Sequence, residues 1–338
     1  MTQPLVSVIT PTRNRAGLLA EALDSVAAQT FADWEQIVVS DGPDDATAEL
    51  MNVRTAADQR LDYVVREGEP AGANVCRNIG LKRARADLVV FLDDDDQLGP
   101  DCLAGRVGLM QRNPDVDFAV FGAGVFAQAP GDLGRRYHDL EPGDDLLRFL
   151  SLDCPWQTSG PVWRRAYLQR LGGFCERLAS MQDLELHVRA LCARPNYLIS
   201  PAIDHYIRAH HDAARTSLRH FLDPELIRHA EAAPRMLLDE VERAGLLTWS
   251  RRRALLGLAF GSAESWARIG ERREALRAWR ETCRAWSVPA SLALPGALAL
   301  RVTGPAASQR GWAARLVNKW KGWVRFRQEP ALSAGGVA

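Results

Sequence analysis

The stretch Leu88–Asp96 reads Leu-Val-Val-Phe-Leu-Asp-Asp-Asp-Asp and decides how this chain folds. Its five apolar residues form an unbroken run, which is typical of a strand buried on both faces of a parallel sheet. Four carboxylates follow with no basic residue among them, and such close negative charges repel one another unless a cation lies between them. Because open α/β sheets bind ligands at the carboxyl ends of their strands, we predict a hard divalent cation here. The alternative is a solvated acidic turn.

Strand and helix patterns alternate along the first hundred residues, which predicts a doubly wound α/β sheet with short right-handed crossovers. Thr10, Arg13 and Asp41 follow two of the predicted strands, so we expect them at the same sheet edge as Asp93–Asp96. The predicted strands are 5–9, 34–40, 61–66 and 88–92, and the predicted helices are 16–29, 46–57 and 73–86.

Beyond Pro100 the alternation is lost, and a mixed arrangement is predicted to complete the same sheet. The pattern indicates strands at 116–126, 197–200 and 203–208, helices at 143–152, 164–171 and 179–193, and an irregular or extended stretch at 155–163. The last third of the chain is predicted to be helical. Within it, 255–283 has the apolar spacing of a helix–turn–helix, and 288–302 is apolar but interrupted by two prolines.

The 338 residues carry 42 basic and 42 acidic side chains, distributed unevenly along the chain. The part from His220 onward has 19 Lys and Arg against 11 Asp and Glu, whereas the part before it has 23 against 31. This asymmetry predicts different partners for the two parts. The six cysteines have no paired metal spacing and fit reduced thiols of a cytoplasmic protein. We expect neither a signal peptide nor a membrane-spanning helix, because no basic leader and no run of about 18 apolar residues is present.

The basic stretch 282–328 contains eight Lys and Arg and no acidic residue. Within it, 312–326 mixes bulky aromatic side chains with cations, a composition suited to the interface of an anionic membrane. We therefore predict peripheral attachment through 301–327 to the inner face of the cytoplasmic membrane. The alternatives are a helix packed on the protein's own core and a contact with a second copy of the chain. Nucleic acid is not an expected partner, because nothing upstream resembles a nucleic-acid-binding module.

Six short motifs resemble those of glycosyltransferase family 2, which has the GT-A fold, a Rossmann-like mixed α/β sheet flanked by helices. They are Val6–Asn14, Val38–Gly42, Arg77–Gly80, Phe91–Asp96, Leu171–Phe174 and Gln182–Asp183. The resemblance covers Leu5–Ser217 and implies a GT-A catalytic domain at 1–219, with a nucleotide-sugar half of about 1–100 and an acceptor half of about 101–219. A helical C-terminal extension at 220–328 and a flexible tail at 329–338 would follow.

The activity implied by this resemblance is sugar transfer from a nucleoside diphosphate donor, UDP- or dTDP-linked, to an acceptor hydroxyl. The acceptor would be a carbohydrate, a lipid-linked sugar or a glycoconjugate in the synthesis of a bacterial cell-surface polysaccharide. The implied cofactor is Mn²⁺ or Mg²⁺, held by Asp95 of the Asp93-x-Asp95 element, with Asp93 near the ribose. The implied donor-binding residues are Thr10, Pro11, Arg13, Asp41, Arg77, Asp93 and Asp94.

Two of these implied roles have structural alternatives. Asp41 stands where the family accepts a ring N–H of a pyrimidine base, and the alternative is a cap on the following turn. Arg77 would pair with the diphosphate, and the alternative is a structural ion pair with a neighbouring carboxylate. Gly172 and Gly173 are expected to form a tight loop against the donor sugar, with a plain turn as the alternative.

Asp183 is the implied general base, because the attacking hydroxyl must lose a proton and a nearby carboxylate can accept it. Direct attack in one displacement inverts the anomeric configuration. The alternative role of Asp183 is capping a helix. Glu185, two residues further on, is expected to be either a surface acid or one that supports the site without touching a ligand. His210 of the pair His210-His211 is the second implied metal ligand, with an ordinary surface pair as the alternative.

Two other classes of function compete with glycosyl transfer. One is a catalytically silent protein that binds nucleotide sugars or assembles with partners. The other is a metal-dependent phosphohydrolase with Asp93 as nucleophile. It is disfavoured because the haloacid-dehalogenase-like pattern has a Thr or Val shortly after its Asp pair, usually at the first strand.

Overall fold

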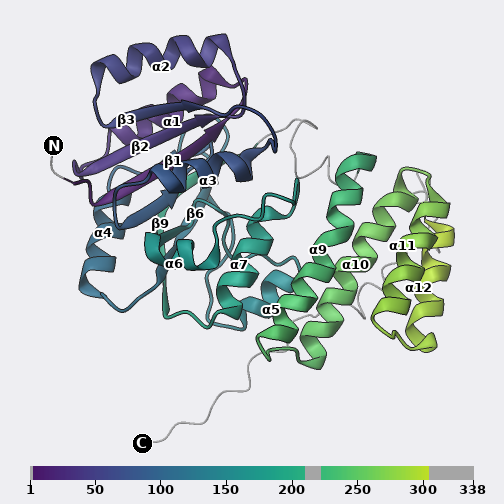
Figure 1. Ribbon diagram of the computed structural model, residues 1–338. Helices are drawn as coiled ribbons and strands as arrows, with labels where there is room; N and C mark the ends of the chain where they lie inside the picture. Colours follow the sequence, from purple (N-terminus) through teal and green to yellow (C-terminus); the bar gives the residue numbers. More distant parts are fainter. Residues whose placement is uncertain (1–2, 210–221, 304–338) are drawn as a thin grey trace, which may run out of the picture. The chain divides into compact units, whose positions relative to one another are not determined.

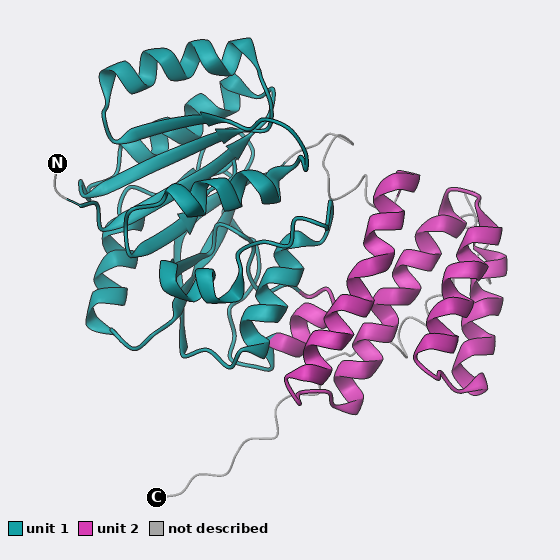
Figure 2. Cartoon of the chain, in the orientation of Figure 1, with its two compact units in different colours: residues 1–145, 154–212 teal, residues 146–153, 213–338 magenta. Residues whose placement is uncertain are grey.

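The structure is a computed structural model that describes residues 3–209 and 222–303. The chain divides into two compact units, coloured separately in Figure 2. Unit 1 comprises 1–145 and 154–212, and unit 2 comprises 146–153 and 213–338. The expected domain boundary at 219/220 lies among residues outside the described part.

Unit 1 is built on one mixed sheet with the strand order β3-β2-β1-β4-β8-β6-β9-β5, and β7 pairs with β6 (Figure 1). The strands on the β3 side are β1 (Val6–Thr12), β2 (Trp34–Ser40), β3 (Leu61–Val65) and β4 (Leu88–Phe91), all mutually parallel. The others are β5 (Gln97–Leu98), β6 (Phe118–Phe126), β7 (Arg135–Arg136), β8 (Pro161–Arg164) and β9 (Tyr197–Arg208). The predicted α/β class and its four early strands are confirmed.

Helices cover both faces of the parallel half, as the doubly wound prediction requires. Residues of α1 and α2 join the apolar cluster that contains Val38 of β2, while Gly80 of α3 lies against Ile9 of β1. A Cβ at residue 80 would come within 2.4 Å of Ile9 Cγ2, so glycine permits the close approach of α3 to the sheet. The helices of unit 1 are α1 (Ala16–Ala27), α2 (Asp45–Ala57), α3 (Ala73–Arg83), α4 (Cys102–Arg112), α6 (Arg165–Leu171) and α7 (Gln182–Cys192).

Strand β1 runs past the end predicted for it. The sequence suggested a stop at Ile9, but β1 continues through Thr12 and pairs with β2 over its whole length. The carbonyl of Ile9 accepts from Leu92 on the β4 side, and that of Thr12 accepts from Asp41 on the β2 side. The nitrogen of Pro11 therefore faces the side where β4 has already ended, so its missing N–H costs no bond of the ladder.

The second half of the sheet differs from the prediction in detail. The two strands expected at 197–200 and 203–208 are one strand, β9, whose pairing with β6 shifts register around Gly122. The stretch expected to be irregular at 155–163 contains β8, which is antiparallel to both β4 and β6. Strand β5 was not predicted, because it has only two residues and its partner β9 is distant in sequence. Helix α4 was not predicted either.

Unit 2 consists of helices and confirms the helical character predicted for the C-terminal part (Figure 1). Helix α12 corrects the expectation that the prolines break 288–302: it begins after Pro289 and continues through Pro295. Ser291, whose carbonyl loses its i+4 partner to Pro295, is solvent-exposed, so water can satisfy it. The described helices that contribute to unit 2 are α5 (Asp145–Leu150), α9 (Pro224–Arg243), α10 (Trp249–Arg268), α11 (Arg272–Ala285) and α12 (Ala290–Val302).

Candidate functional site: an acidic sheet edge compensated by arginines

The carboxyl ends of β1, β2 and β4 lie side by side at one edge of the sheet, because these strands are adjacent and parallel. Arg13 and Arg15 follow β1, Asp41 follows β2, and the run Asp93–Asp96 begins two residues after the end of β4. The edge thus gathers the charged residues that the sequence placed there, as well as Arg15, which the sequence analysis did not single out.

Asp93 is paired with Arg77 of α3. The guanidinium Nη2 lies 2.5 Å from Asp93 Oδ1, and the Arg77 side chain is only 5% exposed. The guanidinium carbon is also 5.1 Å from the centre of the Phe174 ring, within range of a cation–π interaction. Arg77 Nε and Nη1 are buried without a hydrogen-bond partner, so the carboxylate contact leaves donors of this arginine unused. The ion pair with a carboxylate, one of the two roles expected for Arg77, is present.

Asp94 is the most buried of the acidic run together with Asp96. Its Oδ2 accepts a hydrogen bond from Thr12 Oγ1 at 2.7 Å, and its Oδ1 lies 3.2 Å from Arg15 Nη1. Burial raises the pKa of Asp94 to about 6, although the bond from Thr12 and the charge of Arg15 oppose the shift. Thr12 was missed by the sequence analysis because the strand was expected to end before it.

Asp95 and Asp96 are each tied to neighbouring segments. Asp95 Oδ2 lies 3.1 Å from the same Arg15 Nη1, so one nitrogen bridges two consecutive carboxylates. At the end of β9, the Arg208 backbone N–H donates to Asp96 Oδ1 at 3.1 Å, and its Nε donates to the Asp95 carbonyl at 3.1 Å. In this structure, arginines distant in sequence compensate the charges of the acidic run: Arg77 pairs with Asp93, and Arg15 bridges Asp94 and Asp95.

The donor set of this edge fits a hard divalent ion. Asp93, Asp94 and Asp95 offer carboxylate oxygens, the ligands preferred by Mg²⁺ and accepted by Mn²⁺. Within 3–209 and 222–303, however, no three His, Cys, Asp or Glu side chains are arranged to hold a metal by themselves. Phosphate oxygens of a substrate would have to complete the coordination. His210, the second predicted ligand, lies outside the described residues.

Asp41 is held by the loop that follows β3. Its Oδ1 accepts from Arg66 Nε at 2.5 Å and from the Gly72 backbone N–H at 2.9 Å, and its side chain is only 7% exposed. Arg13, whose side chain is 69% exposed, reaches Asp41 Oδ2 at 3.5 Å. Two hydrogen bonds therefore anchor Asp41 Oδ1, and its Oδ2 makes a long contact with the exposed guanidinium of Arg13.

Thr10 and Pro11 require a correction of position. They were expected beyond the strand end, but both lie within β1 and are buried. The Thr10 hydroxyl accepts a hydrogen bond from Gln36 Nε2 at 3.0 Å, and Thr10 is fully shielded from solvent. As placed, this hydroxyl supports the pairing of β1 and β2 and is not available to a ligand.

Helix α3 connects the acidic edge to the segment that carries Asp183. The amide of Asn78 donates to the Phe174 carbonyl at 2.9 Å and accepts from the Phe174 N–H at 2.8 Å. Asn74, one turn earlier, donates to the carbonyls of Cys175 and Leu178. The loop before α7 is thereby bound to the helix whose Arg77 pairs with Asp93.

Asp183 lies in the first turn of α7, where its Oδ1 accepts the Leu184 N–H at 2.8 Å. Glu185, expected to be either a surface acid or one that supports the site without touching a ligand, is 7% exposed, so the surface role is excluded. It makes a two-pronged ion pair with Arg189, at 2.7 and 2.8 Å. Arg189 in turn donates to the carbonyls of Leu171 and Gly173. Of the two acids at the start of α7, Glu185 is committed to holding the glycine turn.

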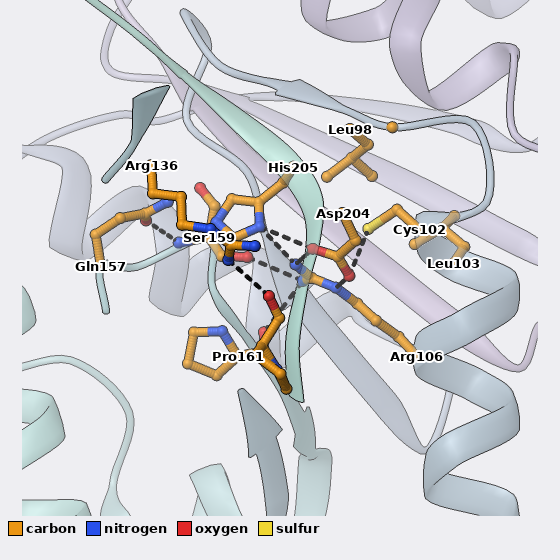
Figure 3. Close-up of polar contacts among 12 residues, drawn as sticks. Leu98, Cys102, Leu103, Arg106, Arg136, Gln157, Ser159, Pro161, Asp204 and His205 are labelled. Atoms are coloured by element: carbon orange, nitrogen blue, oxygen red, sulfur yellow. Dashed lines mark hydrogen bonds and ion pairs between the residues drawn. The ribbon is translucent and has the colours of Figure 1, made fainter. Parts of the chain in front are cut away.

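A buried polar cluster that sequence reasoning missed lies where α4, β8 and β9 meet (Figure 3). Arg106 is fully buried and makes a two-pronged ion pair with Asp204 at 2.7 and 2.9 Å. Burial by itself would raise the pKa of Asp204, but the charge of Arg106 and its hydrogen bonds lower this pKa to about 2. His205 Nδ1 and Cys102 Sγ also contact Asp204. No local sequence pattern predicts this pairing, because Arg106 and Asp204 are 98 positions apart.

The described helices include none that is both long enough and apolar enough to cross a membrane.

Comparison with known proteins finds a family and several relatives to which the N-terminal part of the chain is similar. Residues 7–164 match the family described as Glycosyl transferase family 2. The chain is 34% identical over 154 residues to the "Putative teichuronic acid biosynthesis glycosyltransferase TuaG" of Bacillus subtilis, covering 45% of this chain and 60% of that protein. It is 32% identical over 134 residues to the "GalNAc(5)-diNAcBac-PP-undecaprenol beta-1,3-glucosyltransferase" of Campylobacter jejuni, covering 40% and 42%. The chain thus spans less than two thirds of either relative.

Solved structures share the fold at low sequence identity. The crystal structure of S. aureus TarS superposes with a TM-score of 0.63 at 19% identity, covering 94% of this chain and 54% of TarS. The mannosyltransferase PcManGT from Pyrobaculum calidifontis, solved with GDP-Man and Mn²⁺, gives 0.53 at 21% identity, covering 94% and 86%. The fold is that of the GT-A class. Residues 7–164 belong to glycosyl transferase family 2.

Proposed function

We propose that this chain is a metal-dependent, inverting glycosyltransferase that moves a sugar from a UDP- or dTDP-linked donor to an acceptor hydroxyl. The observation that carries the proposal is the shared sheet edge within the family 2 region, where Asp41 follows β2 and Asp93–Asp95 follow β4, the two parallel strands on either side of β1. Ligands of open α/β sheets bind outside such strand ends.

Asp41 is the proposed reader of the donor base. Because Gly72 and Arg66 fix its Oδ1, the carboxylate has a set orientation before the donor arrives. A carboxylate accepts hydrogen bonds only, which suits the ring N–H of uracil or thymine and not the unprotonated ring nitrogen of cytosine. Arg13 lies within reach of Asp41 and is mostly exposed, so it is suited to pair with a donor phosphate.

Asp95, with Asp93 and Asp94 beside it, is the proposed holder of Mn²⁺ or Mg²⁺. When bound, the ion supplies charge neutralisation for the departing diphosphate. Arg77 fixes Asp93, and Thr12 fixes Asp94, so the chain orients these carboxylates through bonds from α3 and β1.

Asp183 is the proposed general base. It lies at the start of α7, behind a loop that Asn74 and Asn78 bind to α3, and α3 also carries the partner of Asp93. In this role its carboxylate takes the proton of the acceptor hydroxyl as oxygen attacks the anomeric carbon, and one displacement inverts that centre. Glu185 is less suited to the role because Arg189 occupies both of its oxygens.

The acceptor is proposed to belong to a bacterial cell-surface polysaccharide or glycoconjugate, carried on a lipid or on a growing polymer. The two relatives, one named for teichuronic acid synthesis and one for an undecaprenol-linked glycan, support this class. The basic aromatic stretch within 301–327 would hold the enzyme near such an acceptor at an anionic membrane. Residues 304–327 of that stretch lie outside the described part.

Donor turnover with manganese tests the proposal. The purified protein is incubated with UDP- and dTDP-sugars and a panel of carbohydrate and lipid-linked acceptors, and release of nucleoside diphosphate is followed with and without chelator. We expect release that requires metal and is lost in Asp95→Ala, while calorimetry shows UDP binding tightly only with metal. Equal UDP affinity in chelator and in manganese contradicts the metal assignment. Metal-dependent binding without release would identify a silent binding protein, and release of inorganic phosphate a phosphohydrolase.

A further inference from the structure

Arg15 differs from the other arginines of the acidic edge in how it is held. Arg77 is 5% exposed and packs on Phe174. Arg208 is 12% exposed, and its side chain donates to the Asp95 carbonyl and pairs with Glu21. Arg15 is 41% exposed, and its Nη1 bridges side-chain oxygens of Asp94 and Asp95. It lies just before α1, so its flexible side chain can leave the carboxylates without disturbing a strand or helix.

The position of Arg15 Nη1 is one that a divalent ion would also favour. It lies 3.2 Å from Asp94 Oδ1 and 3.1 Å from Asp95 Oδ2, between two carboxylates that repel each other when nothing separates them. A metal bound to Asp95 and this guanidinium carry the same sign of charge, so both cannot remain at the same oxygens.

We propose that Arg15 is a tethered counter-cation of the acidic edge, which the divalent metal displaces when it arrives together with the donor diphosphate. The inference rests on the proposed function and adds a residue that sets the coupling between metal and nucleotide. Metal alone must compete with Arg15 for Asp94 and Asp95, so it binds weakly. With the diphosphate present, phosphate oxygens complete the coordination, and the released guanidinium pairs with the phosphates.

Arg13 provides a matched control. It lies two residues before Arg15 on the same connection and carries the same charge, but its contact is with Asp41 at 3.5 Å. A general electrostatic effect of removing one positive charge near the edge would appear in both variants. Competition for the carboxylates of Asp94 and Asp95 would appear in the Arg15 variant alone.

The test measures Mn²⁺ affinity by the electron paramagnetic resonance signal of free Mn²⁺, with and without saturating UDP, at constant ionic strength. Wild type, Arg15→Gln, Arg15→Lys and Arg13→Gln are compared, and circular dichroism confirms that each is folded. For Arg15→Gln we expect Mn²⁺ alone to bind about tenfold tighter, because the ion no longer competes with a guanidinium. A tenfold change corresponds to about 1.4 kcal/mol. The factor by which UDP strengthens Mn²⁺ binding should fall about tenfold as well, and by reciprocity Mn²⁺ should strengthen UDP binding less.

Arg15→Lys retains a tethered cation and should keep the wild-type coupling within about threefold. Arg13 is proposed to pair with a donor phosphate, so Arg13→Gln serves as the control only without UDP, where its affinity for Mn²⁺ should stay within about threefold of wild type. Wild-type coupling in Arg15→Gln, or an equal gain in Mn²⁺ affinity without UDP in Arg13→Gln, overturns the inference. So does the absence of Mn²⁺ binding by wild type in the presence of UDP. These readouts are separate from turnover. Unchanged coupling in Arg15→Gln, with sugar transfer by the wild type present, refutes the role of Arg15 alone. Absence of sugar transfer by the wild type refutes the proposed function.

Discussion

The side-chain amide of Asn78 and the backbone of Phe174 are joined by two hydrogen bonds, although the residues are 96 positions apart in the sequence. Nδ2 donates to the Phe174 carbonyl at 2.9 Å, and Oδ1 accepts the Phe174 N–H at 2.8 Å. Asn78 thus pairs with a loop as a neighbouring strand would. This contact passes directly beside Gly173, where an added Cβ would lie 2.4 Å from Asn78 Oδ1.

Gly173→Ala should therefore be more destabilising than Gly172→Ala. Both glycines have positive φ, +85° at 172 and +72° at 173, so alanine costs about 1–2 kcal/mol at either site. Only at 173 must Asn78 also move, which adds about 1–3 kcal/mol for buried polar groups left unpaired. Urea denaturation of the two variants measures the difference. Equal losses of unfolding free energy in the two variants would mean that the Asn78 contact contributes little. In that case, adding Asn78→Ala to Gly173→Ala should not recover any of the lost stability.

Asp183→Asn should reduce turnover by about 10²–10⁴-fold, because the amide keeps the shape of the side chain but cannot accept the acceptor's proton. Donor binding should change little, since Asp183 is not among the residues proposed to hold the nucleotide. Steady-state transfer rates and calorimetric UDP titration with manganese check the two halves of this prediction. Near-normal turnover would assign Asp183 to the bond it makes with Leu184 in the first turn of α7.

His187 should make the fold sensitive to mild acid. Burial between Trp163 and Trp156 lowers the pKa of His187 to about 3, whereas an unfolded histidine has a pKa of about 6.5. Because the folded pKa is the lower one, the unfolded state binds an extra proton below about pH 6.5. The native state therefore loses about 1.4 kcal/mol per pH unit as the pH falls from there towards 3.

His187→Phe keeps an aromatic ring at this position and removes the titration. We expect the stability of wild type relative to His187→Phe to fall by about 1.4 kcal/mol between pH 7.5 and 5.5 in urea denaturation. The other histidines are common to both proteins and cancel in the comparison. A difference that does not change with pH would show that His187 is solvated or hydrogen-bonded in the protonated form.

Membrane attachment should depend on the cations of the C-terminal stretch. Each contributes on the order of 1 kcal/mol at an anionic surface, so replacing Lys319, Lys321 and Arg325 by Gln should release the protein from anionic vesicles. High salt should weaken the attachment of wild type by screening. Co-sedimentation with anionic and with neutral vesicles measures both effects, with UDP binding as the control for folding. Failure of wild type to sediment with anionic vesicles at low salt would favour a soluble acceptor.

Local sequence was sufficient to predict the parallel half of the sheet. The short apolar run 88–92, rich in branched side chains, favours a strand buried inside a sheet, and the alternating patterns before it leave few other topologies. As a result, β1, β2, β3 and β4 were located within about three residues. Alternation also placed Asp41 and Asp93–Asp96 at one edge, because the carboxyl ends of adjacent parallel strands coincide. The motif order added the family, which physical periodicity alone does not specify.

Only the tertiary structure decided which partner each of these charges has. The bridge from Arg15 to Asp94 and Asp95, the bond from Thr12 to Asp94 and the ion pair of Arg106 with Asp204 join residues about 80 to 100 positions apart. Side-chain pairing over such separations depends on strand order and on sub-ångström register, and neither is encoded in local spacing. The same reason made β5 invisible in the sequence: two residues carry no periodicity, and the strand exists only because β9 lies beside it.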